Sequence, residues 1–144
     1  MRALLDVNVL IALLDPDHAF HLRAHRWWLS NQRSGWSSCP LIENGVVRIM
    51  SNPGYSRSVN FSASQLIEQL RQFVSRTDHE FWPDDVSLRD EAVFAGERLH
   101  SSRSLTDSYL LALASRHGGR LATFDQGIPM SSVRNATAAN LCAL

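Results

Sequence analysis

Two short apolar segments of this 144-residue chain each lead to an aspartate, and they constrain the fold more than any other feature. Residues 2–6 read RALLD, and residues 120–124 read RLATF with Asp125 directly after them. Short apolar runs of this kind are typical of strands that are covered on both faces. Because the segments between them have helical patterns, we expect an α/β protein. Its predicted architecture is a three-layer α/β/α sandwich around a mostly parallel, twisted sheet.

Helical patterns account for most of the chain between these two strands. The predicted helices cover residues 7–14, 18–32, 40–50, 64–76, 88–101 and a segment that opens at Leu105 and closes at Gly118. In the second helix we expect a buried face made of Phe20, Leu22, Ala24, Trp27 and Trp28. The last helix contains YLLALA, which is apolar nearly all round and therefore predicts deep burial, with Thr106 or Asp107 as its cap.

Composition excludes several classes of protein. The chain has the length of one ordinary domain and shows no repeat or linker, so we expect residues 1–144 to form a single domain. Fourteen basic and fourteen acidic residues give a formal net charge of zero, which excludes a histone-like basic coat. Lysine is absent, so chemistry through a lysine Schiff base or a P-loop lysine is excluded.

The cysteines and the amino terminus indicate a reduced, cytoplasmic setting. Cys39 and Cys142 lie far apart and make neither a zinc motif nor a disulfide framework. The apolar run near the amino terminus is interrupted by Asp6 and Asn8, which argues against a signal peptide. No apolar stretch approaches the ~18 residues of a membrane span. We therefore expect a protein that does not contact membranes.

Four acidic residues lie beside or within apolar segments rather than on charged faces: Asp6, Glu43, Asp107 and Asp125. Carboxylates are rarely buried unless they are paired or bind a metal ion. If the four converge, their mutual repulsion calls for a cation, and a site made only of oxygen ligands suits Mg²⁺ or Mn²⁺. Such ions activate water for an in-line attack on phosphate. Singly, Asp107 is also explained as a first-turn acid and Asp125 as a turn former.

The order of these motifs resembles that of the PIN-domain nucleases, and in particular the VapC-type toxins of bacterial toxin–antitoxin pairs. The resemblance rests on DVNVLIAL from Asp6, on Glu43 in a mid-chain helix, on Thr106-Asp107 before an apolar helix, and on ATFD ending at Asp125. It covers essentially the whole chain. It implies that Asp6, Glu43, Asp107 and Asp125 are the catalytic, metal-binding acids, with Mg²⁺ or Mn²⁺ as cofactor.

The same resemblance implies further properties. Asn8 and Thr123 match positions that orient the acids by hydrogen bonds. The implied reaction is endonucleolytic cleavage of structured RNA, such as transfer RNA or a ribosomal loop, which leaves a 3′-hydroxyl and a 5′-phosphate. The implied partners are a cognate VapB-type antitoxin and a second copy of the chain in a homodimer.

Other interpretations stay open at this point. The main alternative is a non-catalytic PIN-like module that binds RNA or protein. An aspartyl phosphatase or a phospho-acceptor domain is disfavoured because both normally need a lysine, and Asn8 stands where a phosphatase needs a second aspartate. The loop from Met50 to Ser58, with Arg57 and Tyr55, is a candidate for RNA contact. Trp36 and Trp82 are expected in the core, together with one of the adjacent Trp27 and Trp28.

Overall fold

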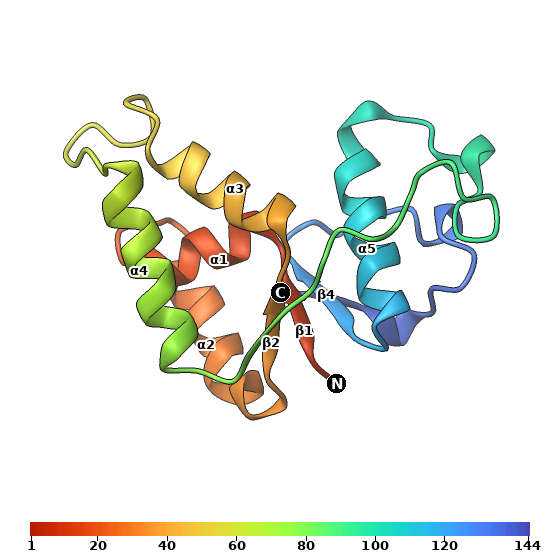
Figure 1. Cartoon of the computed structure of the whole chain (residues 1–144), viewed down its shortest axis with the longest axis horizontal. Helices are drawn as coiled ribbons and strands as arrows, with labels where there is room; N and C mark the ends of the chain where they lie inside the picture. Colours follow the sequence, from red (N-terminus) through yellow and green to blue (C-terminus); the bar gives the residue numbers. More distant parts are fainter.

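The computed structural model describes residues 1–144 and is centred on a five-stranded sheet (Figure 1). In spatial order the strands are β3 (His79–Phe81), β2 (Trp36–Ser38), β1 (Ala3–Leu5), β4 (Arg120–Thr123) and β5 (Leu141–Ala143). All four pairs of neighbouring strands are parallel. The predicted parallel sheet is therefore confirmed.

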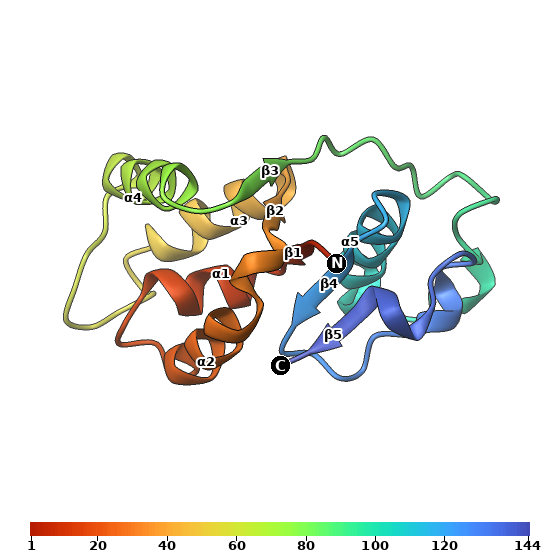
Figure 2. The ribbon, with the colours of Figure 1, turned by 90° about the horizontal axis from the view of Figure 1, so that it is seen from below.

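Helices cover both faces of the sheet, as Figures 1 and 2 show. On one side lie α1 (Val7–Leu14), α2 (His21–Asn31), α3 (Pro40–Met50) and α4 (Ala63–Ser75). On the other side lies α5 (Leu105–Arg116), with the short 3₁₀ turns Gly96–Arg98, Ser102–Ser104, Met130–Ser132 and Ala138–Asn140. The three-layer α/β/α arrangement is confirmed. None of these helices combines the length and hydrophobicity that crossing a membrane requires.

The core forms where the apolar patterns of strands and helices meet. The central strands contribute side chains with no exposed surface, among them Leu4, Leu5 and Leu121. Helix α5 is buried on nearly all sides, as its apolar sequence predicts. It ends where Gly118 adopts a positive φ of 64°, a conformation that glycine takes at little cost and that closes many helices.

An aromatic cluster anchors the β2 side of the core. Trp36 is 1% exposed, and its ring lies 4.4 Å from that of His79, 5.1 Å from that of Phe73 and 6.4 Å from that of Trp28, between centroids. Trp28 is buried, whereas Trp27 is only partly buried. The expectation that one member of this adjacent pair joins the core is confirmed, and Trp82 on the far side is buried as well.

The helix predicted over residues 88–101 is wrong. This stretch consists of turns and a short 3₁₀ segment, and Phe94 makes an isolated antiparallel bridge to Val133. Its local polar side chains hold non-helical backbone, since Asp90 accepts a hydrogen bond from the Ala92 amide. Longer-range bonds complete the arrangement, because Ala95 N–H donates to the Ser132 carbonyl. Tertiary contacts therefore override a helical pattern here.

Several boundaries also differ from the prediction. Helix α2 begins at His21 rather than residue 18, and Phe20 and Leu22 are 45% and 68% exposed, so they do not face the core. Helix α5 is capped by Ser104 rather than Thr106 or Asp107, because the 3₁₀ turn Ser102–Ser104 runs directly into it. The sequence does not predict strand β5, because Leu141–Ala143 has only three residues, too few to show a strand pattern.

The strand order fixes where a ligand site can form. After β1 the chain builds outward through β2 and β3, and it then returns to place β4 on the other side of β1. The order of connection therefore reverses between β1 and β4. In parallel α/β sheets, ligands bind at the carboxyl ends of the strands beside such a reversal. The residues that follow β1 and β4 meet at this place.

Candidate active site

Asp6 follows β1 at this reversal and is 7% exposed. It caps α1, because its Oδ1 accepts a hydrogen bond of 2.7 Å from the Val7 amide. Its Oδ2 accepts a second bond of 2.9 Å from the Thr123 hydroxyl at the end of β4. Burial is the main cause that raises the Asp6 pKa, and these two hydrogen bonds oppose the rise.

Thr123 connects Asp6 to Asp125. While its hydroxyl donates to Asp6, its oxygen accepts a bond of 3.0 Å from the Asp125 backbone amide. The Asp125 carboxylate in turn accepts a bond of 2.7 Å from the Gly127 amide, and the side chain is exposed. One fully buried threonine therefore fixes the ends of two neighbouring strands relative to each other, and with them two carboxylates.

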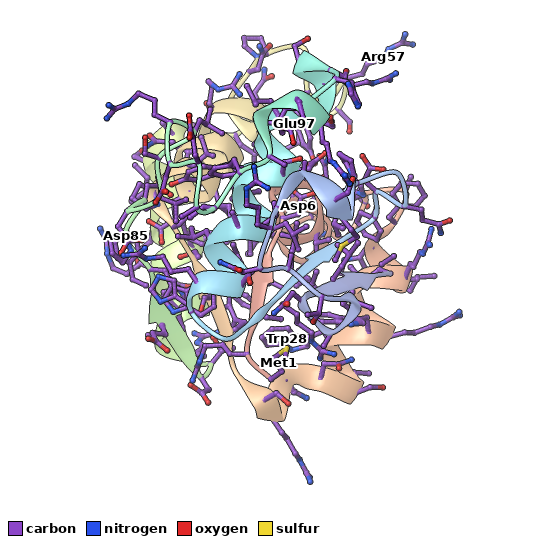
Figure 3. All side chains as sticks on the ribbon, turned by 90° about the vertical axis from the view of Figure 1, so that its right-hand side faces the viewer. Met1, Asp6, Trp28, Arg57, Asp85 and Glu97 are labelled. Atoms are coloured by element: carbon purple, nitrogen blue, oxygen red, sulfur yellow. The ribbon has the colours of Figure 1, made fainter.

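Asp107 reaches the same place from the first turn of α5. Burial is the largest of the causes that together raise the pKa of Asp107 to about 6, and the nearby charges of Asp6 and Asp125 and a contact with the Asp125 side chain are the others. Three aspartates from β1, α5 and the turn after β4 therefore form a cluster of like charges. Figure 3 shows Asp6 at the end of β1 that lies away from Met1.

Glu43 takes part in a different set of contacts. It lies in the first turn of α3, and its Oε1 accepts a hydrogen bond of 2.6 Å from the Ser38 hydroxyl. The Ser38 oxygen lies 2.8 Å from His79 Nε2. Because Ser38 has one proton and gives it to Glu43, His79 is the donor in the second bond. No hydrogen bond joins the Glu43 side chain to Asp6, Asp107 or Asp125, and its one side-chain hydrogen bond is the one from Ser38.

The two residues predicted to orient the acids differ in their surroundings. Thr123 makes the contacts described above. The Asn8 side chain is exposed on α1 and makes no hydrogen bond, so its orienting role stays a prediction. Sequence analysis missed Ser38 and His79, the residues that hold Glu43. The sequence gives little indication of this role, because a serine at the end of a strand and a single histidine more often stabilise the fold than take part in a functional site.

The donor chemistry of the three aspartates suits a divalent cation. No arginine or histidine forms an ion pair with Asp6, Asp107 or Asp125, so their charges are uncompensated. Oxygen-only sets of this kind suit Mg²⁺ or Mn²⁺. No three Asp, Glu, His or Cys side chains are arranged as a complete ligand set. The fit of these residues to a divalent ion rests on their chemistry and charge, and not on a preformed ligand geometry.

The raised pKa of Asp107 predicts a pH-dependent stability in the absence of metal. Its folded pKa of about 6 exceeds the ordinary value of 3.8, so the folded state disfavours the ionised form. Protonated Asp107 therefore adds to the free energy of unfolding. This contribution is fully present below the unfolded pKa of 3.8 and is lost as the pH rises through the folded pKa of about 6. The Asp107→Asn variant should therefore gain stability over the wild type by about 1 kcal/mol more at pH 7 than at pH 4, after allowance for solvent screening.

Urea unfolding in EDTA at the two pH values measures this difference. The exposed Asp17→Asn variant is the matched control, since it removes a carboxylate that does not contribute to the pKa shift of Asp107. If the Asp107→Asn variant differs from the wild type by the same amount at pH 4 and pH 7, Asp107 does not titrate in this way.

Comparison with known proteins gives matches over nearly the whole chain. The model of the PIN domain family matches residues 3–133, a range that includes all four predicted acids. Ribonuclease VapC44 of Mycobacterium tuberculosis is 46% identical over 144 residues, the full length of both proteins. Ribonuclease VapC39 of the same organism is 43% identical over 132 residues, 92% of this chain and 94% of that protein. Ribonuclease VapC38 is 42% identical over 129 residues, 88% and 86% of the two chains.

Proposed function

This chain belongs to the PIN domain family and to its VapC-type ribonucleases, and we propose that it cuts RNA with a divalent metal ion held by Asp6, Asp107 and Asp125. The observation that carries the proposal is the meeting of these three aspartates, without a counter-charge, at the reversal of strand order. Like charges that raise the pKa of a neighbouring carboxyl group in this way are relieved by protons or by a cation. At neutral pH a divalent ion would offset the negative charge of all three carboxylates.

The metal ion and the residues around it would have separate roles in RNA cleavage. A bound Mg²⁺ or Mn²⁺ ion would activate water and stabilise charge on phosphate oxygens. Thr123 holds the Asp6 carboxylate and the Asp125 backbone in place, and the carboxylates would still have to close around an ion, since no three of them are arranged as a complete ligand set. Glu43, held by Ser38, completes the predicted set of acids from the neighbouring strand end. It would act on the ion or on its water rather than through contact with the aspartates.

A side-chain nucleophile does not fit the surroundings of the acids. Cys39 is buried, and burial raises the pKa of its thiol to about 12. A thiol with such a pKa is not a nucleophile at neutral pH. Ser38 is fully buried as well and donates its proton to Glu43. Water is therefore the attacking group in the proposed reaction, as in hydrolysis that leaves a 5′-phosphate.

The proposal extends to the cellular role. As a VapC-type ribonuclease, the chain would act as a toxin on RNA in the cytoplasm and would be neutralised by a VapB-type antitoxin. We propose that residues 1–144 act as one domain and that two copies form a homodimer. Structured RNA, such as transfer RNA or ribosomal RNA, is the substrate class that we expect.

Cleavage of total bacterial RNA tests the function. Purified chain, free of antitoxin, should produce discrete fragments with Mg²⁺ or Mn²⁺ and none in EDTA, and end-mapping should find 5′-phosphates. Cleavage that persists in EDTA would contradict the metal dependence. A folded protein that binds RNA but cuts none under any metal condition would instead favour the alternative, a non-catalytic PIN-like binding module.

A further inference from the structure

A polar cavity of about 540 Å³ adjoins the aspartates at Asp125. Its size is that of a small-ligand pocket. No aliphatic side chain other than that of a proline lines it. The lining residues are Arg98, His100, Ser101, Arg103, Ser104, Asp125, Gly127 and Pro129. One wall is thus the segment from Arg98 to Ser104, and the other is the turn that follows β4.

The two arginines of this cavity are not engaged by any acid. Arg98 and Arg103 form no ion pair, and their side chains make no hydrogen bond, whereas the ion pairs of the chain use Arg2, Arg71 and Arg116. Both residues are exposed. Their guanidinium groups are therefore free to bind an anion, and the amino-terminal end of α5 beside them adds a positive dipole end.

The position of the arginines next to the acids indicates which anion they bind. An RNA strand carries one negative charge per nucleotide, so a strand with one phosphate at the carboxylates must place the next phosphate beside them. At the Asp125 side, that neighbouring phosphate would enter this cavity. Without a positive group, Asp125 would repel it.

We propose that Arg98 and Arg103 bind the RNA backbone phosphate that neighbours the one being cut, and so position the strand over the aspartates. This inference rests on the proposed function, since it needs RNA at the acids. The polar lining favours a phosphodiester over a protein partner, because protein interfaces are centred on apolar and aromatic side chains. Figure 3 labels Glu97, which precedes Arg98, and Asp6 on this side of the molecule.

The other basic segment noted in the sequence is less suited to this task. In the loop after α3, the Tyr55 hydroxyl donates a hydrogen bond of 2.5 Å to Asp15. Burial and this contact with Asp15 raise the Tyr55 pKa. A ring held in this way is not free to stack on a base. Arg57 of that loop does not line the cavity at Asp125.

Binding of a short fluorescent single-stranded RNA of mixed sequence tests the proposal, in EDTA so that nothing is cut. The Arg98→Ala/Arg103→Ala protein should bind roughly tenfold more weakly at about 100 mM salt, and its log affinity should fall less steeply with log salt, by about 1.4 in slope. The Arg98→Lys/Arg103→Lys protein should recover most of the binding. The control is Arg26→Ala/Arg33→Ala, which removes two exposed arginines of α2 and the turn after it.

The outcomes separate this inference from the proposed function. If the Arg98→Ala/Arg103→Ala protein keeps the affinity and salt slope of the control, or if the wild type does not bind RNA at all, the phosphate site is refuted. In the first case an acidic segment of a partner protein becomes the better occupant. A wild type that binds RNA through these arginines but cuts none with Mg²⁺ or Mn²⁺ would refute the proposed function and leave the phosphate site standing.

Discussion

Replacing Asp6 by asparagine should lower the rate of RNA cleavage at least about a thousandfold, equivalent to about 4 kcal/mol of activation free energy. The reason is that Asp6 is the most buried of the three aspartates, and asparagine cannot supply the negative charge that a divalent ion needs. The substitution keeps the volume of the side chain and leaves one amide oxygen for the Thr123 hydroxyl. It gives up the cap bond from the Val7 amide, which costs about 1 kcal/mol, and it removes a buried charge that burial disfavours. The loss should therefore be one of chemistry rather than of folding.

The stability of the same variant gives an independent check. Burial raises the pKa of Asp6, so its charge is unfavourable in the metal-free folded state. In EDTA at neutral pH, Asp6→Asn should unfold at the same urea concentration as the wild type or at a higher one. Mg²⁺ should then stabilise the wild type and not the variant, because a ligand that binds only the folded state raises stability by mass action.

Cleavage assays with identically purified proteins, together with growth after expression in bacteria, measure the loss. Asp17→Asn is again the matched control, as an exposed aspartate outside the site, and it should cut RNA as the wild type does. Equal cleavage by the wild type and Asp6→Asn would assign the activity to a contaminating nuclease. Loss of folding in Asp6→Asn would contradict the account of Asp6 as an unfavourable buried charge.

Replacing Trp36 by alanine should lower the free energy of unfolding by about 3–5 kcal/mol, a large part of the stability of a domain of this size. Trp36 is fully enclosed by the aromatic cluster, and its Nε1 donates a hydrogen bond of 2.8 Å to Thr77 Oγ1. Removal would leave a cavity, and the Thr77 hydroxyl would keep its bond to the Phe73 carbonyl but lose the indole N–H that donates to it. Because Trp36 lies two residues before Ser38 on β2, the contact that holds Glu43 should be lost as well.

Urea unfolding followed by far-UV circular dichroism measures this loss. Trp27→Ala is the comparison, since Trp27 is only partly buried and contacts Cys142 Sγ at 3.3 Å and the Arg120 guanidinium. The Trp27→Ala substitution should lower the free energy of unfolding by about 1 kcal/mol. Similar losses in the two variants would mean that the aromatic cluster around Trp36 is not the anchor of this side of the core.

The fold class followed from the sequence because its signals are local. A strand can be predicted from the apolar runs of residues 2–6 and 120–124, and a helix from the amphipathic pattern of residues 64–76. The start of that helix, α4, is also marked locally, by the Ser62–Gln65 capping box. The prediction of a helix over residues 88–101 failed because the structure of this segment is decided by its contacts with residues 132–134. A pattern within one segment carries no information about a partner forty residues away.

The sequence by itself determined which acids lie beside buried segments and which element carries each, since apolar neighbours and strand ends can be read locally. The tertiary structure alone decided that the charges of Asp6 and Asp125 act on Asp107 and that Glu43 is held by Ser38, which also contacts His79. It also decided that Arg98 and Arg103 stand unpaired at the cavity that adjoins Asp125. Strand order is the physical reason. The strand order brings together aspartates that are more than a hundred positions apart in the sequence. Burial and charge repulsion raise the pKa values of Asp6 and Asp107 only once the residues are close in space.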